Sequence, residues 1–166
     1  MTAMESFIDR LDYPMYVVTA AADGERAGCL VGFASQCSIV PVRFMMWLST
    51  ANRTYRVARA ADVLAVHLLG CEQYALAEHF GGRTGDEVDK FAGVAWHEGP
   101  AGAVVLDDAV AWFVGRVERL VEGGDHVGFL LSPLEAAAPG PPSPDWEPFR
   151  LSDGRSIEAG HPVPDA

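Results

Sequence analysis

Two polar segments that lie close together in the sequence carry side chains suited to binding an anion. The first holds Ser35, Gln36 and Ser38, and the second holds Ser49, Thr50, Asn52, Arg53 and Thr54. Hydroxyl groups, a side-chain amide and the free N–H groups at a helix start suit a phosphate monoester, because those N–H groups and the helix dipole favour negative charge. Arg53 would complete the charge balance through paired hydrogen bonds. The alternative interpretation is two ordinary polar loops, the second of which caps a helix.

The distribution of charge supports the anion site independently. The chain has 12 basic and 23 acidic residues and a formal net charge of −11, the opposite of the usual footprint of a nucleic-acid-binding protein. From Arg26 to Ala61, however, there is no Asp or Glu, and Arg26, Arg43, Arg53, Arg56 and Arg59 all fall in that stretch. A nearby carboxylate would compete with phosphate for arginine, so the acid-free stretch indicates a local anion site. The alternative is chance combined with a buried pair of strands.

The remaining chemistry-bearing residues form no catalytic or metal-binding pattern. Histidines 67, 79, 97 and 161 show neither HExxH nor facial-triad spacing, so we predict no metal. No Ser-His-Asp or nucleophile-elbow pattern is present either. Cys29, Cys37 and Cys71 form no CxxC pair, which is typical of free thiols in a reducing cytosol. The acidic N-terminus lacks the apolar region of a signal peptide, and no apolar run reaches the ~20 residues of a membrane span. We therefore expect a cytoplasmic protein without membrane contact.

These residues must be positioned by a mainly β domain. The patterning predicts strands over residues 14–20, 27–33, 43–49, 63–69, 110–121 and 126–131, and helices over 54–62, 72–80 and 86–91. Turns are predicted at 22–24 and 123–125, and 34–38 is expected to be a polar connection. Six strands without regular βαβ alternation favour a closed antiparallel barrel over a doubly wound sheet.

The composition changes near the C-terminus. Six of the eleven prolines lie between Pro133 and Pro148, which predicts an extended arm rather than a second domain. Trp146, Phe149 and Ile157 make this arm apolar enough to dock on the body of the domain or on a partner subunit. We therefore divide the chain into a domain over residues 1–135 and an arm over 136–166.

Several segments, taken in order, resemble the flavin-reductase-like family of FMN-binding split barrels. The run from Gly28 to Ala58, GCLVGFASQCSIVPVRFMMWLSTANRTYRVA, resembles the start of that domain, and QYALAEHF, GDEVDKFAGVAWHEG and VLDDAVAWFVGRVERLVEGGDHVGFLL follow in the family's order. The likeness covers roughly residues 12 to 135, and the closing Gly160-His161-Pro162 fits one subgroup. The sequence departs from the family where Val40-Pro41-Val42 replaces Asp-Pro-Pro and where Phe33-Ala34 replaces Thr-Ala. These changes affect the expected shape of the flavin loop.

The resemblance implies a six-stranded antiparallel split β-barrel with short helices, a homodimer, and FMN in a groove near the subunit interface. It places the isoalloxazine ring against Ala34, Ser35, Gln36, Cys37 and Ser38, the phosphate on Ser49, Asn52, Arg53 and Thr54, and Phe80, Gly81 and Lys90 over the flavin. It also places His126 near the flavin face, where nicotinamide stacks. For His126 the alternative is a hairpin histidine satisfied by its neighbours. For Lys90, which is the sole lysine, the alternative is an ordinary surface residue.

The expected function is that of an NAD(P)H:flavin oxidoreductase, with FMN (or FAD) as the flavin, NADH or NADPH as the donor, and a separate monooxygenase as a partner. Because the flavin carries the chemistry, the absence of a strong acid–base pair agrees with this function. The alternative from another class is a flavin carrier or accessory subunit without turnover, which the substitutions at Phe33 and Val40 keep open. Use of deazaflavin or haem on the same barrel ranks last, because nothing resembles an axial haem ligand.

Overall fold

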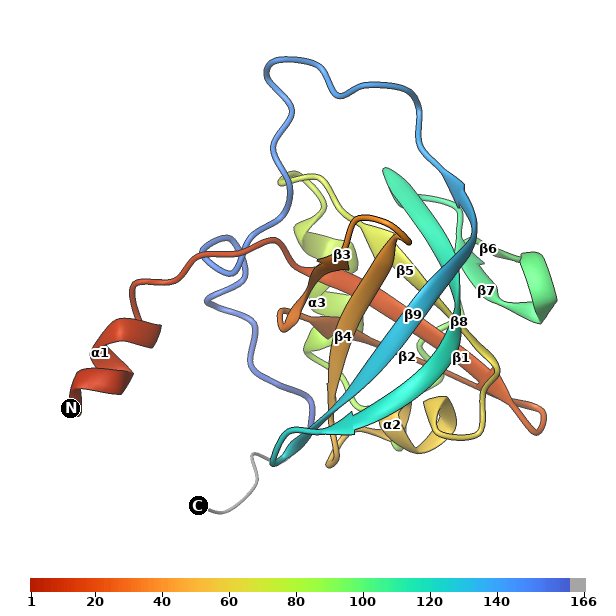
Figure 1. The fold of residues 1–166 in the computed structure, drawn as a ribbon, viewed down its shortest axis with the longest axis horizontal. Coiled ribbons are helices and arrows are strands. Elements are labelled where there is room, and N and C mark those ends of the chain that lie inside the picture. Colours follow the sequence, from red (N-terminus) through yellow and green to blue (C-terminus); the bar gives the residue numbers. More distant parts are fainter. Residues whose placement is uncertain (162–166) are drawn as a thin grey trace.

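Seven strands form one antiparallel sheet in the computed structural model, which describes residues 1–161 (Figure 1). In spatial order they are β2 (Glu25–Val31), β1 (Tyr16–Ala22), β5 (Val63–Leu68), β8 (Ala111–Glu122), β9 (His126–Ala137), β4 (Arg43–Ser49) and β3 (Ala34–Ser38). A second sheet pairs β6 (Trp96–Glu98) with β7 (Val104–Leu106). The mainly β, antiparallel prediction is confirmed. The count of six strands is wrong, because the segment 34–38 pairs with β4 instead of forming a connection.

The main sheet is strongly curled. Its two edge strands, β2 and β3, are consecutive in the chain and are joined only by Gly32 and Phe33. Three residue steps reach about 11 Å at most, so the opposite edges of the sheet must approach each other at this connection. Within residues 1–161 no ladder joins β2 to β3, so the sheet is split along this line.

Alternating side chains of the strands fill the inside of the curled sheet. Val18, Met46, Leu48, Leu64 and Phe129 are buried there in one cluster, as the two-residue period of a strand requires. The residue before Val18 in β1, Val17, points to the opposite face and packs with Phe80 and Phe149 in a second cluster. The sheet therefore carries a core on both faces, and side chains on its outer face can also take part in a site.

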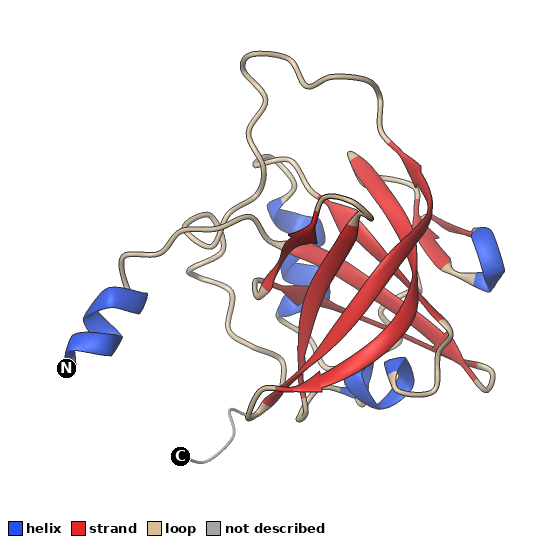
Figure 2. Ribbon diagram, viewed as in Figure 1, coloured by secondary structure: helices blue, strands red, loops and turns tan. Residues whose placement is uncertain are grey.

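Short helices lie outside the sheet (Figure 2). They are α1 (Ala3–Ile8), α2 (Arg53–Ala58), α3 (Tyr74–Gly81) and the 3₁₀ turn η1 (Pro100–Gly102). The predicted helices over 54–62 and 72–80 correspond to α2 and α3, whereas 86–91 forms turns only. Helix α1 stands away from the body, and none of its residues is buried (Figure 1). None of the helices in the described part of the chain is long and apolar enough to cross a membrane.

The C-terminal segment leaves β9 after Ala137 and returns along the body as an extended loop (Figure 1). It is anchored at Phe149, whose side chain is fully buried and whose N–H donates to the Leu69 carbonyl at 2.9 Å. The Phe149 carbonyl in turn accepts from the Met15 N–H at 2.8 Å. Of the two docking surfaces expected for Phe149, the structure therefore uses the body of the same chain.

Candidate functional site

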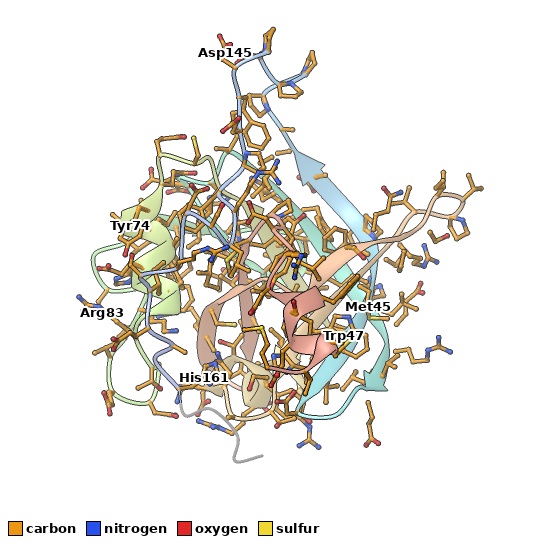
Figure 3. The ribbon with its side chains drawn as sticks, turned by 90° about the vertical axis from the view of Figure 1, so that its left-hand side faces the viewer. Met45, Trp47, Tyr74, Arg83, Asp145 and His161 are labelled. Atoms are coloured by element: carbon orange, nitrogen blue, oxygen red, sulfur yellow. The ribbon has the colours of Figure 1, made fainter. Side chains whose placement is uncertain are left out.

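Two adjoining cavities form a groove along β2. Their volumes are about 170 and 190 Å³, and both are lined by Met15, Cys29, Leu30, Asn52 and His161. Figure 3 shows His161 between Arg83, which lines the first cavity, and Trp47, which lines the second. The groove is thus built from β2, β4, the start of β9, the end of α3, the residues before β1 and α2, and the C-terminal segment.

One end of the groove is aromatic. Tyr13, Phe33, Trp47 and His126 line it, with ring centroids 6.2 Å apart for Tyr13 and Phe33 and 5.0 Å apart for Phe33 and His126. Trp47 can lie close to the β8–β9 hairpin because a Cβ added at Gly123 would be 2.5 Å from its ring. This end offers flat, largely apolar walls, which is the environment that an aromatic ring system prefers.

His126 is oriented by its neighbours. It is the first residue of β9, it is paired with Ser49 of β4, and its side chain is half-buried in the aromatic end. Its Nδ1 lies 2.7 Å from the Asp125 carboxylate. Because a carboxylate only accepts, Nδ1–H donates to it, and Nε2 is left as the nitrogen available to a ligand.

Polar groups lie along the rest of the groove. Asn52 caps α2 by accepting the Thr54 N–H at 2.9 Å, and the Ser49 hydroxyl accepts the Ala51 N–H at 3.3 Å. Within the described residues, the amide nitrogen of Asn52 and the hydroxyl hydrogen of Ser49 donate to no protein group, so both remain available to a ligand. Arg83 adds a positive charge in the first cavity. This set of donors and one cation suits an anionic or hydroxyl-rich group.

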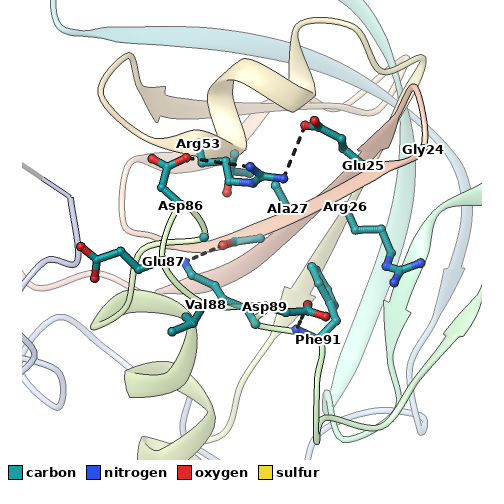
Figure 4. Close-up of a pocket in the computed structure, with 14 residues that line it drawn as sticks. Gly24, Glu25, Arg26, Ala27, Arg53, Asp86, Glu87, Val88, Asp89 and Phe91 are labelled. Atoms are coloured by element: carbon teal, nitrogen blue, oxygen red, sulfur yellow. Dashed lines mark hydrogen bonds and ion pairs between the residues drawn. The ribbon is translucent and has the colours of Figure 1, made fainter.

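Figure 4 shows a third cavity, of about 400 Å³, which is lined by Gly85, whereas the neighbouring Thr84 lines the first cavity of the groove. One of its two arginines, Arg53, already faces carboxylates, at 3.4 Å from Glu25 and 3.9 Å from Asp86. Arg56 lies 2.5 Å from Asp86, and this hydrogen bond, together with the positive charges, lowers the pKa of the Asp86 carboxyl. Arg53 is therefore neutralised by the protein itself, whereas Arg26, which also lines this cavity, lies over the Trp96 ring.

Lys90 is not a surface lysine, because it is buried and its ammonium group makes structural hydrogen bonds. Only 4% of it is exposed, and its Nζ donates to the carbonyl oxygens of Gly28 and Phe80, both at 2.8 Å. Burial lowers the pKa of its ammonium group. Lys90 thus joins β2 to α3 and borders the third cavity from inside.

The structure brings together only part of the residue set predicted from the sequence. Ser49, Asn52, Phe80, Gly81 and His126 line the groove, whereas Arg53, Thr54 and Lys90 line the third cavity. The edge strand β3 borders none of these three cavities, and it holds Ala34, Ser35, Gln36, Cys37 and Ser38. Gln36 instead lines a separate apolar cavity, and its side-chain amide donates to the Ser38 carbonyl at 3.0 Å.

Sequence reasoning missed several groove residues. Tyr13, Leu30, Phe33, Trp47 and Arg83 were not predicted to belong to the site, although all of them line the groove. The available signal was Gly32, because a Cβ there would be 2.5 Å from the Tyr13 ring and only glycine allows this approach.

Comparison with known proteins agrees with this architecture. The family model described as flavin reductase like domain matches residues 8–144. The FMN reductase (NADH) RutF of Ancylobacter novellus is 32% identical over 117 residues, which cover 70% of this chain and 64% of that protein. The NADH:FAD oxidoreductase SgcE6 of Streptomyces globisporus C-1027 superposes with a TM-score of 0.78 at 27% identity, covering 92% of this chain and 89% of that one.

The curated relatives are longer than the matching part of this chain. The chain spans 64% of the RutF protein and 55% of the reductase subunit HsaB of Rhodococcus jostii, which is 27% identical over 110 residues and matches 66% of this chain. The family match nevertheless extends over most of the sequence. It includes the residues between Tyr13 and His126 that line the two cavities of the groove. The chain therefore belongs to the flavin reductase like domain family.

Proposed function

We propose that this protein is an NAD(P)H:flavin oxidoreductase that binds FMN, with FAD as the alternative, in the groove along β2. The observation that carries the proposal is the composition of the groove. A flat aromatic end lies next to a row of polar donors with one arginine, and the two cavities have volumes of about 190 and 170 Å³. A flavin mononucleotide has the matching halves, a planar ring and a hydroxylated chain that ends in phosphate.

The residues present fit such a cofactor. Tyr13, Phe33 and Trp47 supply apolar surface for a ring, while Ser49 and Asn52 retain donors for polar atoms. A bound flavin supplies the redox chemistry, taking a hydride from NADH or NADPH and giving up the electron pair again. The protein itself needs to hold the ring, limit the access of water and leave room for the donor.

His126 is the residue that we propose to act at the ring. Its Nδ1–H is held by Asp125 at 2.7 Å, so its orientation is fixed before any ligand arrives. Its Nε2 can then accept a hydrogen bond from the flavin or from the carboxamide of the nicotinamide donor. In this role His126 positions a reactant and transfers no proton.

The phosphate contacts predicted for Arg53 and Thr54 require a change in the third cavity. Arg53 would have to exchange Glu25 and Asp86 for the ligand, whereas Arg83 already borders the groove. Residues 34–38 line neither cavity of the groove, although Phe33, directly before them, does. Their role at the flavin stays a prediction, as does the division of the chain into residues 1–135 and 136–166.

A flavin carrier without turnover is the second candidate function. The observation that favours it is Phe33, whose ring is tilted against His126 at 5.0 Å and is 51% exposed at the mouth of the groove. A ring at this place competes with the nicotinamide for the surface beside His126. The carrier would bind flavin equally well but would not be reduced by either donor.

We further propose that the protein is a cytoplasmic homodimer that supplies a two-component monooxygenase. Helix α1 supports the dimer, because Met4 and Phe7 are 61% and 59% exposed and the described part of the chain buries no residue of this helix. The partner is suggested by relatives named as reductase components, such as that of 4-hydroxyphenylacetate 3-monooxygenase in Salmonella typhimurium, which is 26% identical. Three free thiols agree with a reducing compartment. A monomeric mass in solution would refute the dimer.

The experiment that tests the function is an anaerobic absorbance spectrum of the protein with FMN, recorded before and after NADH and then NADPH. Loss of the flavin band at about 450 nm with catalytic amounts of protein is the expected result, since reduction removes the conjugation of the oxidised ring. Flavin that binds but is bleached by neither donor would establish the carrier instead. A protein that binds no flavin would refute both functions.

A further inference from the structure

Phe33 places a large apolar side chain at the mouth of the groove instead of in the core. It is 51% exposed, and it belongs to none of the three hydrophobic clusters formed by residues 1–161. It nevertheless lines the cavity of about 190 Å³ at the aromatic end of the groove. A side chain in this position contributes little to the core, but it contacts any ring that enters the cavity.

The backbone of Phe33 is held in place. Its carbonyl oxygen accepts the Trp47 N–H of β4 at 2.9 Å, and beside it the Ala34 N–H donates to the Gly32 carbonyl at 3.1 Å. Gly32 and Phe33 are the whole connection between the edge strands β2 and β3, so the connection has no spare residues. A movement at this position is therefore a rotation of the side chain and not a movement of the loop.

The ring of Phe33 rests on two other rings. Its centroid lies 5.0 Å from that of His126, at an interplanar angle of 55°, and 6.2 Å from that of Tyr13, at 59°. A tilted ring pair stabilises an arrangement by roughly a two- to tenfold change in its equilibrium constant. Exposed side chains change rotamer on the order of nanoseconds or faster. The two contacts thus favour one position of the ring without locking it there.

This position covers the part of His126 that a ligand would use. The Asp125 carboxylate lies 2.7 Å from His126 Nδ1 and fixes the imidazole, so the imidazole cannot turn to present another face. With Phe33 at 5.0 Å, a ring already occupies the space beside it. Phenyl and nicotinamide are both flat six-membered rings, and therefore one can replace the other on the same surface.

We propose that Phe33 is a gate for the nicotinamide donor, and thereby a specificity-determining residue of the reaction. In the free protein its ring rests on His126, and the nicotinamide ring displaces it by rotation of the side chain. The inference rests on the proposed function, because it takes the groove as the flavin site and His126 as the neighbour of the donor. It differs from the block that a flavin carrier requires, since the side chain can turn away while the backbone stays fixed.

The kinetic signature of such a gate follows from its speed. Side-chain rotation is far faster than a typical turnover of about 1–1000 per second, so the Phe33 ring acts as a competitor at equilibrium. Competition of this kind raises the KM for the donor and leaves kcat unchanged. NADH and NADPH carry the same nicotinamide ring, so the gate affects both donors by the same factor.

The test compares steady-state kinetics of the full-length wild type and Phe33→Ala at saturating FMN. We expect the KM for each donor that the protein uses to fall about fivefold, with kcat changed by less than about twofold. Phe33→Tyr keeps the ring and should keep the wild-type KM. Leu134→Ala is the control, because this residue is also exposed and apolar but borders none of the three cavities, and it should show wild-type kinetics.

FMN dissociation constants, measured by quenching of flavin fluorescence, separate the donor from the flavin. They should rise by no more than about threefold in Phe33→Ala, because Tyr13 and Trp47 still wall the cavity. A KM that is unchanged or raised in Phe33→Ala overturns the gate, although a wild type that reduces FMN remains a reductase. A kcat that falls with the KM would show that Phe33 positions the reactants, which also contradicts the gate.

The anaerobic spectra distinguish failure of the gate from failure of the function. If FMN on the wild type is bleached by neither donor, but FMN on Phe33→Ala is bleached, the reductase function fails for the wild type while the gate is supported as a complete block. If FMN is bleached on neither protein, the proposed function and the gate fail together. A lower KM for each donor in Phe33→Ala, with kcat unchanged and the wild-type KM retained in Phe33→Tyr, supports both.

Discussion

Acid should destabilise this protein through one buried histidine, His67 on β5. The side chain is fully buried, its Nδ1 lies 2.9 Å from the Val17 carbonyl, and its Nε2 lies 3.0 Å from the Leu106 N–H. A carbonyl only accepts and an N–H only donates, so the imidazole must be neutral, with its hydrogen on Nδ1. It links β1 of the main sheet to β7 of the small one. Protonation of Nε2 would place two donors face to face and would leave the Leu106 N–H without an acceptor.

The magnitude follows from the pKa of His67, which is lowered from 6.5 to about 4, chiefly by burial. Because the folded state disfavours the proton, the contribution of His67 to stability is complete above pH 6.5. It declines as the pH falls and is fully lost below about pH 4. At about 1.4 kcal/mol per pKa unit the full loss is roughly 3 kcal/mol, of which about 2 kcal/mol falls between pH 7 and pH 5. That is a large share of a typical folding free energy of about 5–15 kcal/mol.

The assay is urea unfolding of the wild type and of His67→Gln at pH 7 and pH 5. The glutamine oxygen can still accept from the Leu106 N–H. The variant is expected to be less stable than the wild type at pH 7, but because its side chain does not titrate, it should be less sensitive to acid. We expect the wild type to lose about 2 kcal/mol more than the variant over this interval. All other residues are the same in the two proteins, so their contributions cancel in the difference. Equal losses in the two proteins would refute the reasoning.

Three further variants test the site and its support. His126→Ala should change FMN affinity by no more than about threefold. It should lower kcat/KM for NADH about tenfold or more, because one lost positioning contact is worth roughly 1.4 kcal/mol. Unchanged kinetics with NADH would show that His126 is not part of the site. Asn52→Ala should lower the free energy of unfolding in urea by about 1 kcal/mol, because α2 loses its cap, and it should also weaken FMN binding. An effect on stability alone would show that Asn52 has only a structural role. Lys90→Met leaves the carbonyl oxygens of Gly28 and Phe80 without their donor, and we expect a loss of about 2–4 kcal/mol in urea unfolding, which a wild-type midpoint would contradict.

The fold could largely be predicted from the sequence because its strands are encoded locally. The apolar run 43–49 forms β4 with the predicted bounds, and the glycine turns at 22–24 and 123–125 join the hairpins that they predict. What local patterning could not reveal is β3, since polar residues at 34–38 resemble a connection. That segment becomes a strand because β4 offers it an open edge, and its exposed side chains can stay in water while its backbone pairs.

The candidate site was harder to predict for a related reason. A search for chemistry-bearing side chains finds Ser49 and Asn52, and the family resemblance adds His126. The apolar and aromatic walls of the groove carry no such signal, and nothing in the local sequence distinguishes Leu30 or Ile157 from ordinary core residues. These two residues are 127 positions apart, and they meet only because the C-terminal segment folds back over α3.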